Sequence, residues 1–413
     1  MAIRVEACLI CGARDLEEIL SLGDLPPVNS FLSGPEQIPS EKKHPLAIAF
    51  CTRCTHVQLT HRLDPKDIFE DYIYFSSTSE TVVRWGEALA RRYATELSLG
   101  SGDLVGELAS NDGCILRPFQ ARSRVLGVEP ARNIAEVANR EGVPTRAEFF
   151  DSKLGRSLRQ EVGPARLIVA RNVVAHVPEV VDFIAGAREW LSEDGVLHVE
   201  VPYLRPMVEH VEFDTIYHEH LSYFSVSALD RLFREAGLRL WDVEEVPLHG
   251  GSLIARGRRD GSAPRPSVQR YLENERDAWL HTPAPLRAFA GRTRALRTAI
   301  PEFLHGLAKQ GARIAAYGAA AKGVVLTNYC GIGKETLAFV ADRSQHKQGK
   351  LTPGMHLPVV APSEVMERRP EYLLVLAWNF FDEIVRQMEA YSRAGGQFVL
   401  PVPEPRLSAG TRS

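Results

Sequence analysis

Residues 103–116 read DLVGELASNDGCIL, and this stretch decides the fold of the central part of the 413-residue chain. A mostly apolar run over 104–109 is followed by a short polar loop, and apolar residues resume at Cys114. A strand that turns through such a loop into a helix opens a doubly wound α/β sheet, and the loop lets backbone N–H groups approach a ligand. Because the loop lacks the GxGxxG spacing of pyrophosphate sites, it favours a ligand without phosphate.

Outward from this stretch, short apolar runs alternate with amphipathic segments. They are RVLGVEP (124–130), ARNIAEVANREG (131–142), RLIVARNVVAH (166–176), VDFIAGAREWL (181–191) and GVLHVEVPY (195–203). The alternation predicts parallel βα units, so we assign residues 78–262 to a doubly wound domain. After a GSAPRPS linker, a second α/β series predicts a Rossmann-like domain over residues 263–402, with a disordered tail at 403–413.

We expect a cofactor site at the carboxyl ends of the central strands. Glu129 ends the second strand, where its carboxylate can accept both hydroxyls of a ribose. S-adenosylmethionine (SAM), an adenosine that carries an amino acid in place of phosphates, fits this pattern. The predicted cofactor-binding residues are Glu107, Ala109, Asn111, Asp112, Gly113, Glu129 and Asn172. An alternative is that Glu107 and Asp112 are a strand-end charge and a helix cap.

The first 77 residues are loop-rich and have too few periodic apolar residues for an independent core. They contain two CxxC pairs, which consist of Cys8, Cys11, Cys51 and Cys54. Four thiolates in two such pairs match a tetrahedral structural zinc site, whose closed coordination shell leaves no position for catalysis. We therefore predict a zinc-binding module over residues 1–77, held together by metal rather than by hydrophobic burial.

The composition limits the partners. A net charge of -3, from 49 basic and 52 acidic side chains, provides no excess of positive charge for a nucleic acid. No signal peptide and no apolar run of about 18 residues is present. We expect a cytoplasmic protein, monomeric, with no nucleic-acid or membrane partner.

The densest polar and aromatic cluster is DTIYHEHLSYFS, residues 214–225, here called the YHEH segment. Together with the CxxC pairs, DYIYFSSTS (71–79), GELASNDG, GVEPA, NVVAHV, HGGS (249–252) and YGAAAKG (317–323), it resembles the zinc-containing sugar C-methyltransferases of deoxysugar and antibiotic biosynthesis. The similarity extends from residue 1 to about residue 402. It implies a central class I SAM methyltransferase domain between the zinc module and a C-terminal Rossmann-like domain.

The resemblance also implies a substrate and site residues. The usual substrate is a dTDP-linked 4-keto-deoxysugar that is methylated on the carbon beside the ketone. By motif, the catalytic residues fall on Tyr217, Glu219 and His220, while Tyr72 and Tyr74 line the sugar pocket. The sequence departs from the family at Ala109, where glycine is common, and at Arg171, where a small residue is common.

The residue types suit this chemistry. A carbon beside a ketone becomes nucleophilic when it loses a proton, and His220 can accept that proton near neutral pH. Tyr217 can donate to the enolate oxygen, and Glu219 can orient a residue or hold a sugar hydroxyl. The alternative is a polar cluster with a structural role. His176 either faces the pocket or caps the following helix.

The C-terminal loop YGAAAKG again follows a strand and opens a helix. Its amides after Gly318, together with Lys322, are predicted to hold the diphosphate of a nucleotide sugar, unless the domain binds no ligand. His249 in HGGS is assigned to the substrate site, although its glycines fit close packing equally well. Competing functions are an NAD(P)-dependent sugar oxidoreductase or epimerase, a nucleotide-sugar O-methyltransferase and a zinc-bearing RNA-binding module.

Overall fold

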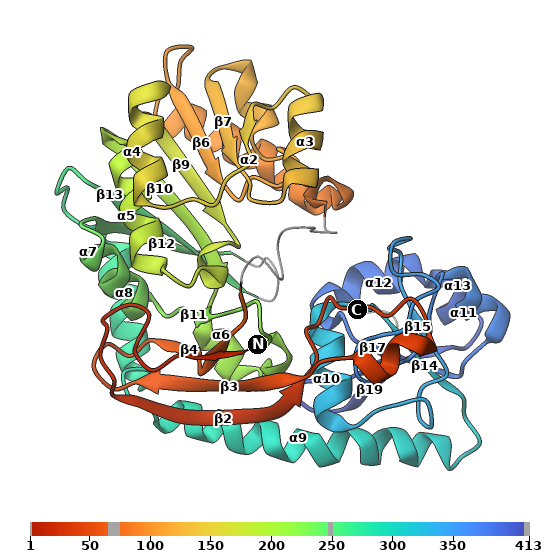
Figure 1. Ribbon diagram of the computed structural model, residues 1–413. Helices are drawn as coiled ribbons and strands as arrows, with labels where there is room; N and C mark the ends of the chain where they lie inside the picture. Colours follow the sequence, from red (N-terminus) through yellow and green to blue (C-terminus); the bar gives the residue numbers. More distant parts are fainter. Residues whose placement is uncertain (1, 65–74, 247–250, 409–413) are drawn as a thin grey trace.

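The computed structural model describes residues 2–64, 75–246 and 251–408, which form three parts connected by one long helix (Figure 1). That helix, α9 (Ala284–Ala308), runs along the N-terminal strands and reaches the C-terminal domain. Among the described residues, no helix is long and apolar enough to cross a membrane.

The central domain is a seven-stranded sheet with the order β12-β13-β10-β9-β6-β7-β8. Its strands are β6 (Leu104–Leu108), β7 (Arg124–Val128), β8 (Thr145–Arg146), β9 (Ala165–Arg171), β10 (Leu191–Pro202), β12 (Arg239–Val246) and β13 (Ser252–Arg258). Strands β6 to β10 are parallel, and β13 is antiparallel to both of its neighbours. The predicted doubly wound sheet is confirmed, and its chain order reverses at β6, which has β7 on one side and β9 on the other.

Helices cover both faces of this sheet (Figure 1). They are α2 (Glu80–Glu96), α3 (Arg132–Arg140), α4 (Ser152–Glu161), α5 (Val180–Trp190), α7 (Val226–Glu235) and α8 (Pro266–Asp277), whereas α6 (Leu204–Glu209) packs against α9. Side-chain oxygens cap two of them: Asp151 accepts from the Leu154 amide at α4, and Ser225 accepts from the Ala228 amide at α7. The sequence between β6 and β7 forms a short 3₁₀ turn, η3 (Arg117–Ala121), which has a proline in its first turn.

Helix α8 packs against α7 and β12 of the central domain. Its buried Glu275 accepts hydrogen bonds from the backbone amides of Val226 and Ser227 at the start of α7, at 2.6 and 2.9 Å. The boundary predicted between residues 262 and 263 therefore separates α8 from the helix and strand that it contacts.

The N-terminal module contains a four-stranded antiparallel sheet with the order β11-β4-β3-β2. Its strands are β2 (Leu16–Leu25), β3 (His44–Cys51), β4 (Val57–Leu59) and β11 (Ser222–Tyr223). Outside it, β1 (Ile3–Arg4) pairs with β5 (His61–Arg62). The prediction of a loop-rich module is wrong for β2 and β3, because their apolar residues are buried against α9 and the C-terminal domain rather than in a core of their own.

The C-terminal domain is a six-stranded sheet with the order β16-β15-β14-β17-β18-β19. Its strands are β14 (Ile314–Tyr317), β15 (Val340–Ala341), β16 (Val359–Val360), β17 (Tyr372–Val375), β18 (Gln397–Leu400) and β19 (Arg406–Ser408). Its helices are α10 (Ala321–Cys330), α11 (Ser363–Arg368), α12 (Phe381–Gln387) and α13 (Glu389–Arg393). The predicted disordered tail is wrong for residues 406–408, because the open edge of β18 pairs with them as an antiparallel strand.

Candidate functional site

The carboxyl ends of β6, β7 and β9 meet at one edge of the central sheet, next to the point where the chain order reverses. Glu107 lies near the end of β6, Glu129 follows β7 and Asn172 follows β9. The structure therefore brings together the residues that the sequence analysis assigns to the cofactor. We call this place the cofactor edge.

The loop after β6 has an uncommon backbone. Ala109, Asn111 and Gly113 are left-handed, with φ values of +54°, +49° and +75°. A Cβ on Gly113 would lie 2.8 Å from Val143, so this position requires glycine. Left-handed residues other than glycine cost free energy and tend to occur where a loop serves a ligand.

Glu129 is held in place by the loop it faces. Its Oε2 accepts from the backbone amide of Asn111, and its Oε1 accepts from that of Ala131, both at 2.9 Å. Each carboxylate oxygen has a second lone pair, so the oriented side chain can still accept ribose hydroxyls.

The side chains of Asn111 and Asp112 contact the polypeptide. Asn111 Oδ1 accepts from the amide of Ser76 at 2.8 Å, and Asp112 Oδ2 accepts from the amide of Ser77 at 3.0 Å. These two residues hold the segment that precedes α2, so their side chains bond to the polypeptide itself.

Acidic side chains gather at the cofactor edge. Burial raises the pKa of Glu107 well above its usual value, and its Oε2 has no hydrogen-bond partner among the described residues. Burial likewise raises the pKa values of Glu129 and Glu200. Arg171 Nε donates to both oxygens of Glu200 at 3.1 Å, and Trp85 Nε1 donates to it at 2.9 Å. A cationic ligand such as SAM, with its sulfonium and ammonium groups, fits this excess of carboxylates.

The sequence analysis missed Glu200 and Trp85. Glu200 lies inside the buried strand β10, where a sequence gives no reason to expect a charged residue at a ligand edge.

The YHEH segment brings Tyr217 and His220 together. The Tyr217 hydroxyl lies 2.7 Å from His220 Nε2, and His220 Nδ1 lies 3.0 Å from the carbonyl oxygen of Thr215. A carbonyl oxygen can only accept, so Nδ1 carries the hydrogen and Nε2 accepts from the tyrosine. Burial, followed by the nearby His176 and Lys322, lowers the pKa of His220 well below its usual value, so the imidazole is neutral at pH 7.

His176 connects the cofactor edge to the YHEH segment. It ends the 3₁₀ turn η4 (Val174–His176), four residues after Asn172, and its ring centroid lies 4.9 Å from that of His220. Helix α5 begins without a side-chain cap. The capping interpretation of His176 is therefore wrong, and its ring packs against His220.

Glu219 is oriented by the N-terminal module. Only 6% of the residue is exposed, and its Oε1 accepts from Asn29 Nδ2 at 2.7 Å. Burial raises the pKa of Glu219 to about 7, against the opposing effects of Asn29 and the cation of Lys347. Asn29 escaped the sequence analysis because it is separated from Glu219 by 190 positions.

Lys322 points toward the YHEH segment rather than into open solvent. Its Nζ is buried without a hydrogen-bond partner among the described residues and lies 4.1 Å from the centroid of the Trp378 ring. Burial raises the pKa of Asp214 to about 6 and that of Glu212 to about 7, while Lys322 opposes both shifts. Glu212, Asp214 and Trp378 were not predicted from the sequence.

The loop after β14 is largely occupied by contacts within the protein. The Ala319 amide donates to Asp342 Oδ2 at 2.7 Å, and Lys347 Nζ donates to the Ala319 carbonyl at 2.8 Å. Gly318 has a φ of +93°, and a Cβ there would lie 2.8 Å from that of Ala377, so packing alone requires this glycine.

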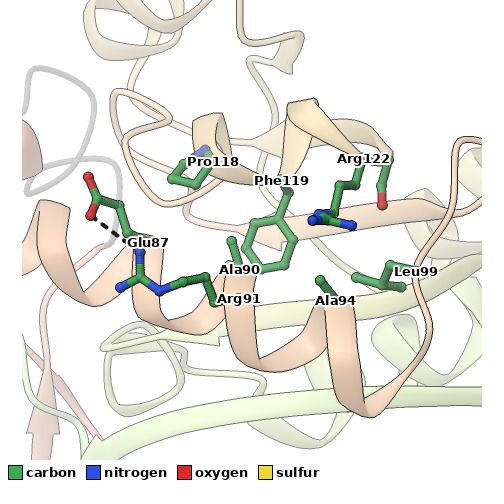
Figure 2. A pocket seen from close by; sticks show the side chains of 9 residues that line it. Glu87, Ala90, Arg91, Ala94, Leu99, Pro118, Phe119 and Arg122 are labelled. Carbon is green, nitrogen blue, oxygen red and sulfur yellow. Dashed lines mark ion pairs between the residues drawn. The ribbon is translucent and has the colours of Figure 1, made fainter.

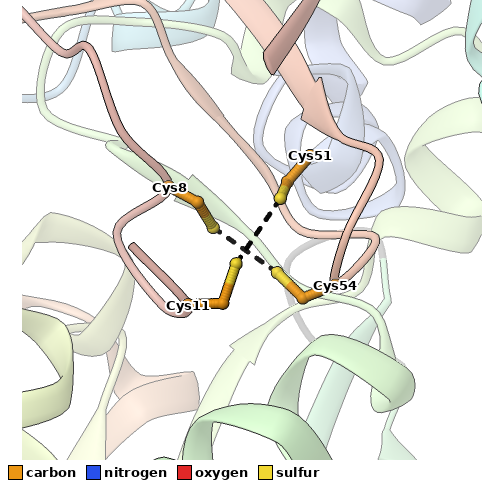
Figure 3. Close-up of side chains that lie close together, drawn as sticks. All are labelled: Cys8, Cys11, Cys51 and Cys54. Atoms are coloured by element: carbon orange, nitrogen blue, oxygen red, sulfur yellow. Dashed lines mark hydrogen bonds between the residues drawn. The ribbon is translucent and has the colours of Figure 1, made fainter. Parts of the chain in front are cut away.

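The four N-terminal cysteines converge on one point (Figure 3). Their Sγ atoms lie within 4.8 Å of one another, with 3.4 Å between Cys8 and Cys54 and 3.6 Å between Cys11 and Cys51. Four sulfurs around a tetrahedral zinc at 2.3 Å would be about 3.8 Å apart, so the cluster fits this ion closely. Cys51 and Cys54 flank the turn between β3 and β4, where a bound zinc would join the turn to the first residues of the chain.

A small hollow of about 200 Å³ lies between α2 and η3 (Figure 2). It is lined by Glu87, Ala90, Arg91, Ala94, Leu99, Pro118, Phe119, Arg122 and Ser123, none of which belongs to the candidate site. Three predicted substrate-binding residues, Tyr72, Tyr74 and His249, lie outside the described residues.

Three family models match this chain in succession. They are "Putative zinc binding domain" at residues 8–69, "Methyltransferase domain" at 79–243 and "C-methyltransferase C-terminal domain" at 247–403. The chain is 36% identical to the C-methyltransferase NovU of Streptomyces niveus over 406 residues, which covers 98% of this chain and 97% of NovU.

Solved structures are similar to less of this chain than NovU is. The SAM-bound magnesium protoporphyrin IX methyltransferase ChlM of Synechocystis is 12% identical, with a TM-score of 0.33 over 45% of this chain and 85% of ChlM. The YcgJ protein of Bacillus subtilis is also 12% identical, with a TM-score of 0.34 over 43% of this chain and 100% of YcgJ.

We expect equimolar zinc in the purified protein, and the replacement Cys51→Ser should abolish it. Loss of one of four thiolates opens the coordination shell, and the N-terminal module should unfold at a lower temperature. Metal analysis and thermal melting followed by circular dichroism measure both effects. Cys330→Ala, far from the cluster in sequence, should retain zinc. Protein purified without chelator that contains no zinc would contradict the assignment.

Replacing Glu129 by alanine should weaken SAM binding by about 1.5–3 kcal/mol, the contribution of hydrogen bonds to a charged group. Isothermal titration calorimetry measures the change. The control is Glu136→Ala, which removes an exposed carboxylate from the outer face of α3 and should leave the affinity unchanged. Equal affinities for Glu129→Ala and wild type would place the adenosine elsewhere.

Proposed function

The chain belongs to the zinc-containing, SAM-dependent C-methyltransferases, and we propose that its substrate is a nucleotide-linked 4-keto-deoxysugar, methylated on the carbon beside the ketone. The main observation in favour of this proposal is the contact between Tyr217 and His220. It places a hydroxyl donor 2.7 Å from a neutral imidazole nitrogen. Methylation at such a carbon requires a base for the proton and a donor for the enolate oxygen.

In the proposed reaction, His220 Nε2 accepts the proton from the carbon, and the electron pair of the broken C–H bond is delocalised onto the ketone oxygen. Tyr217, whose hydroxyl occupies Nε2 in the structure, is displaced by the substrate and donates to that oxygen instead. Bound SAM would supply the methyl group, which is electrophilic because it is attached to a sulfonium; the new C–C bond would form as the S–CH3 bond breaks, and the sulfur would leave as a neutral thioether. The Thr215 carbonyl stabilises the imidazolium through Nδ1–H, and His220 then releases its proton to solvent.

Two further residues complete the proposed sugar site. Glu219, oriented by Asn29, accepts a hydrogen bond from a sugar hydroxyl. His176 packs against the imidazole of His220 and limits its rotation.

The diphosphate, which the family resemblance assigns to dTDP, is placed in this proposal at the start of α10. The Ala319 amide is already bonded to Asp342, so the donors left for a phosphate are the first amides of the helix and the ammonium group of Lys322. Gly318 lets the chain turn into this helix.

The competing functions have no observation in their favour. The match to a C-methyltransferase along the length of the chain favours carbon methylation over a nicotinamide-dependent sugar oxidoreductase or epimerase, a nucleotide-sugar O-methyltransferase and an RNA-binding module.

The replacement His220→Asn should lower kcat by roughly 10²-fold, the usual contribution of a general base, while both ligands still bind. Tyr217→Phe should have a smaller effect, since it removes one donor to the oxyanion. Because the pKa of His220 is lowered, protonation of this base should not reduce kcat at pH 6.5, and a change in rate near pH 7 would come from Glu219, whose pKa burial raises to about 7. The measurement is turnover of a panel of dTDP- and GDP-linked ketosugars as a function of pH.

Proton exchange separates a base from a positioning residue. With a ketosugar in deuterated water and a non-reactive SAM analogue, wild type should incorporate deuterium beside the ketone, and His220→Asn should not. Equal exchange in both proteins would assign the proton to another residue, and turnover of no ketosugar in the panel would reject the substrate class.

Lys322→Ala should raise the KM for the nucleotide sugar about ten- to a hundredfold, as expected for losing a charged contact to phosphate, and leave SAM affinity unchanged. Steady-state kinetics and calorimetry test the two parts. Lys334→Ala, an exposed lysine of the same domain, is the matched control. An unchanged KM in Lys322→Ala would remove Lys322 from the diphosphate site.

A further inference from the structure

A chain of hydrogen bonds connects the C-terminal domain to His220. Trp378 begins the 3₁₀ turn η6 (Trp378–Phe380) after β17, and its Nε1 donates to Asp214 Oδ2 at 2.7 Å. Asp214 belongs to the 3₁₀ turn η5 (Phe213–Thr215), whose last carbonyl accepts from His220 Nδ1 at 3.0 Å. Asp214, which accepts from Trp378, is thus the direct neighbour in the chain of Thr215, whose carbonyl accepts from His220.

The Thr215 carbonyl determines which nitrogen of His220 carries the hydrogen. As long as it faces Nδ1, the lone pair must be on Nε2, which is the atom that contacts Tyr217. A rotation of the peptide between Thr215 and Ile216, which carries this carbonyl, would remove that acceptor and release the ring to the other tautomer. The orientation of this peptide is therefore as important for a base at Nε2 as the histidine itself.

Two local hydrogen bonds stabilise the η5 turn. Thr215 Oγ1 donates to the Glu212 carbonyl at 2.7 Å, and the Ile216 amide donates to the Phe213 carbonyl at 3.0 Å. Both bonds lie within the same short turn, so they cannot fix the turn relative to the rest of the molecule. Outside the turn, Phe213 packs against Tyr329 of α10, and the bond from Trp378, a residue 164 positions away, anchors the Asp214 side chain to the C-terminal domain.

The cost of burying Asp214 supports a specific role. The residue is 0% exposed, and its second oxygen, Oδ1, has no hydrogen-bond partner among the described residues. An apolar side chain would fill this place without the desolvation penalty of a carboxyl group. Lys322 Nζ, packed over the indole ring, holds Trp378 in the orientation that the bond requires.

We propose that Trp378 is a positioning residue of the C-methyltransferase reaction: through Asp214 and the Thr215 carbonyl it fixes the tautomer and orientation of His220. The catalytic importance of this contact rests on the proposed function, in which His220 is the base. The C-terminal domain therefore contributes to the methyl-transfer step itself.

The test is Trp378→Phe, which keeps an aromatic ring and removes the N–H donor. We expect kcat to fall about tenfold at unchanged KM for both substrates, since misplacement of a catalytic group lowers the rate without weakening binding. In protein labelled with ¹⁵N-histidine, the His220 signals, assigned with His220→Asn, should change from a single Nδ1–H tautomer to a mixture. Asp214→Asn, whose amide oxygen can still accept from Trp378, should keep more activity than Asp214→Leu.

Trp279→Phe is the matched control, because Trp279 is 65% exposed and its removal should change neither kcat nor the His220 signals. Unchanged His220 signals in Trp378→Phe would overturn the proposal, whether kcat falls or not, because a loss of kcat alone would show a purely structural role. If His220→Asn retained full activity while Trp378→Phe shifted the tautomer, the positioning contact would stand and the base assignment would fail.

Discussion

The YHEH segment has to satisfy backbone hydrogen bonds with two domains at once, and the rest of the site depends on this constraint. Ser222 and Tyr223 pair with β4 of the N-terminal sheet, and the Leu221 amide donates to the Ala175 carbonyl of the central domain at 2.7 Å. Buried backbone groups are costly to leave unpaired, so both contacts are obligatory. His220 directly precedes this pairing, and β4 directly follows the turn of Cys51 and Cys54. A zinc ion that closes the turn would therefore stabilise His220, the proposed base, through one short strand.

The same segment explains why three domains surround one small site. Asn29 from the N-terminal module orients Glu219, His176 from the central domain packs on His220, and Trp378 from the C-terminal domain holds Asp214. Between η5 and β11, residues 216–221 form no helix or strand that would keep their side chains in place. Its geometry is consequently set from outside, which positions catalytic groups more precisely than a free loop could.

What the sequence could predict follows from how local each feature is. The loop of Gly113 and the strand-end carboxylate of Glu129 could be predicted because each directly follows an apolar strand in the chain, although the helix expected after the loop is the short 3₁₀ turn η3. Asn29 and Trp378 were missed because their partners are 190 and 164 positions away, and nothing in the local pattern marks them. The strands β2 and β3 were read as loop-rich for a related reason: their apolar residues look insufficient until α9 and the C-terminal domain cover them.

The two α/β sheets show why an acidic residue at a strand end does not by itself identify a ribose site. Glu129 and Asp342 make the same pair of contacts, each accepting from an amide of the loop after the first strand and from the amide two residues further along. Both carboxylates therefore hold a loop, with or without a ligand. The sheets differ in the hydrogen-bonding groups that remain available for a ligand. At the cofactor edge, one buried oxygen of Glu107 has no partner within the described part of the chain, whereas Lys347 occupies the corresponding C-terminal loop by donating to the Ala319 carbonyl. A cation is thus favoured at the first edge, and at the second the helix amides and Lys322 favour an anion. This division suits a cationic methyl donor on one side of the YHEH segment and an anionic nucleotide sugar on the other.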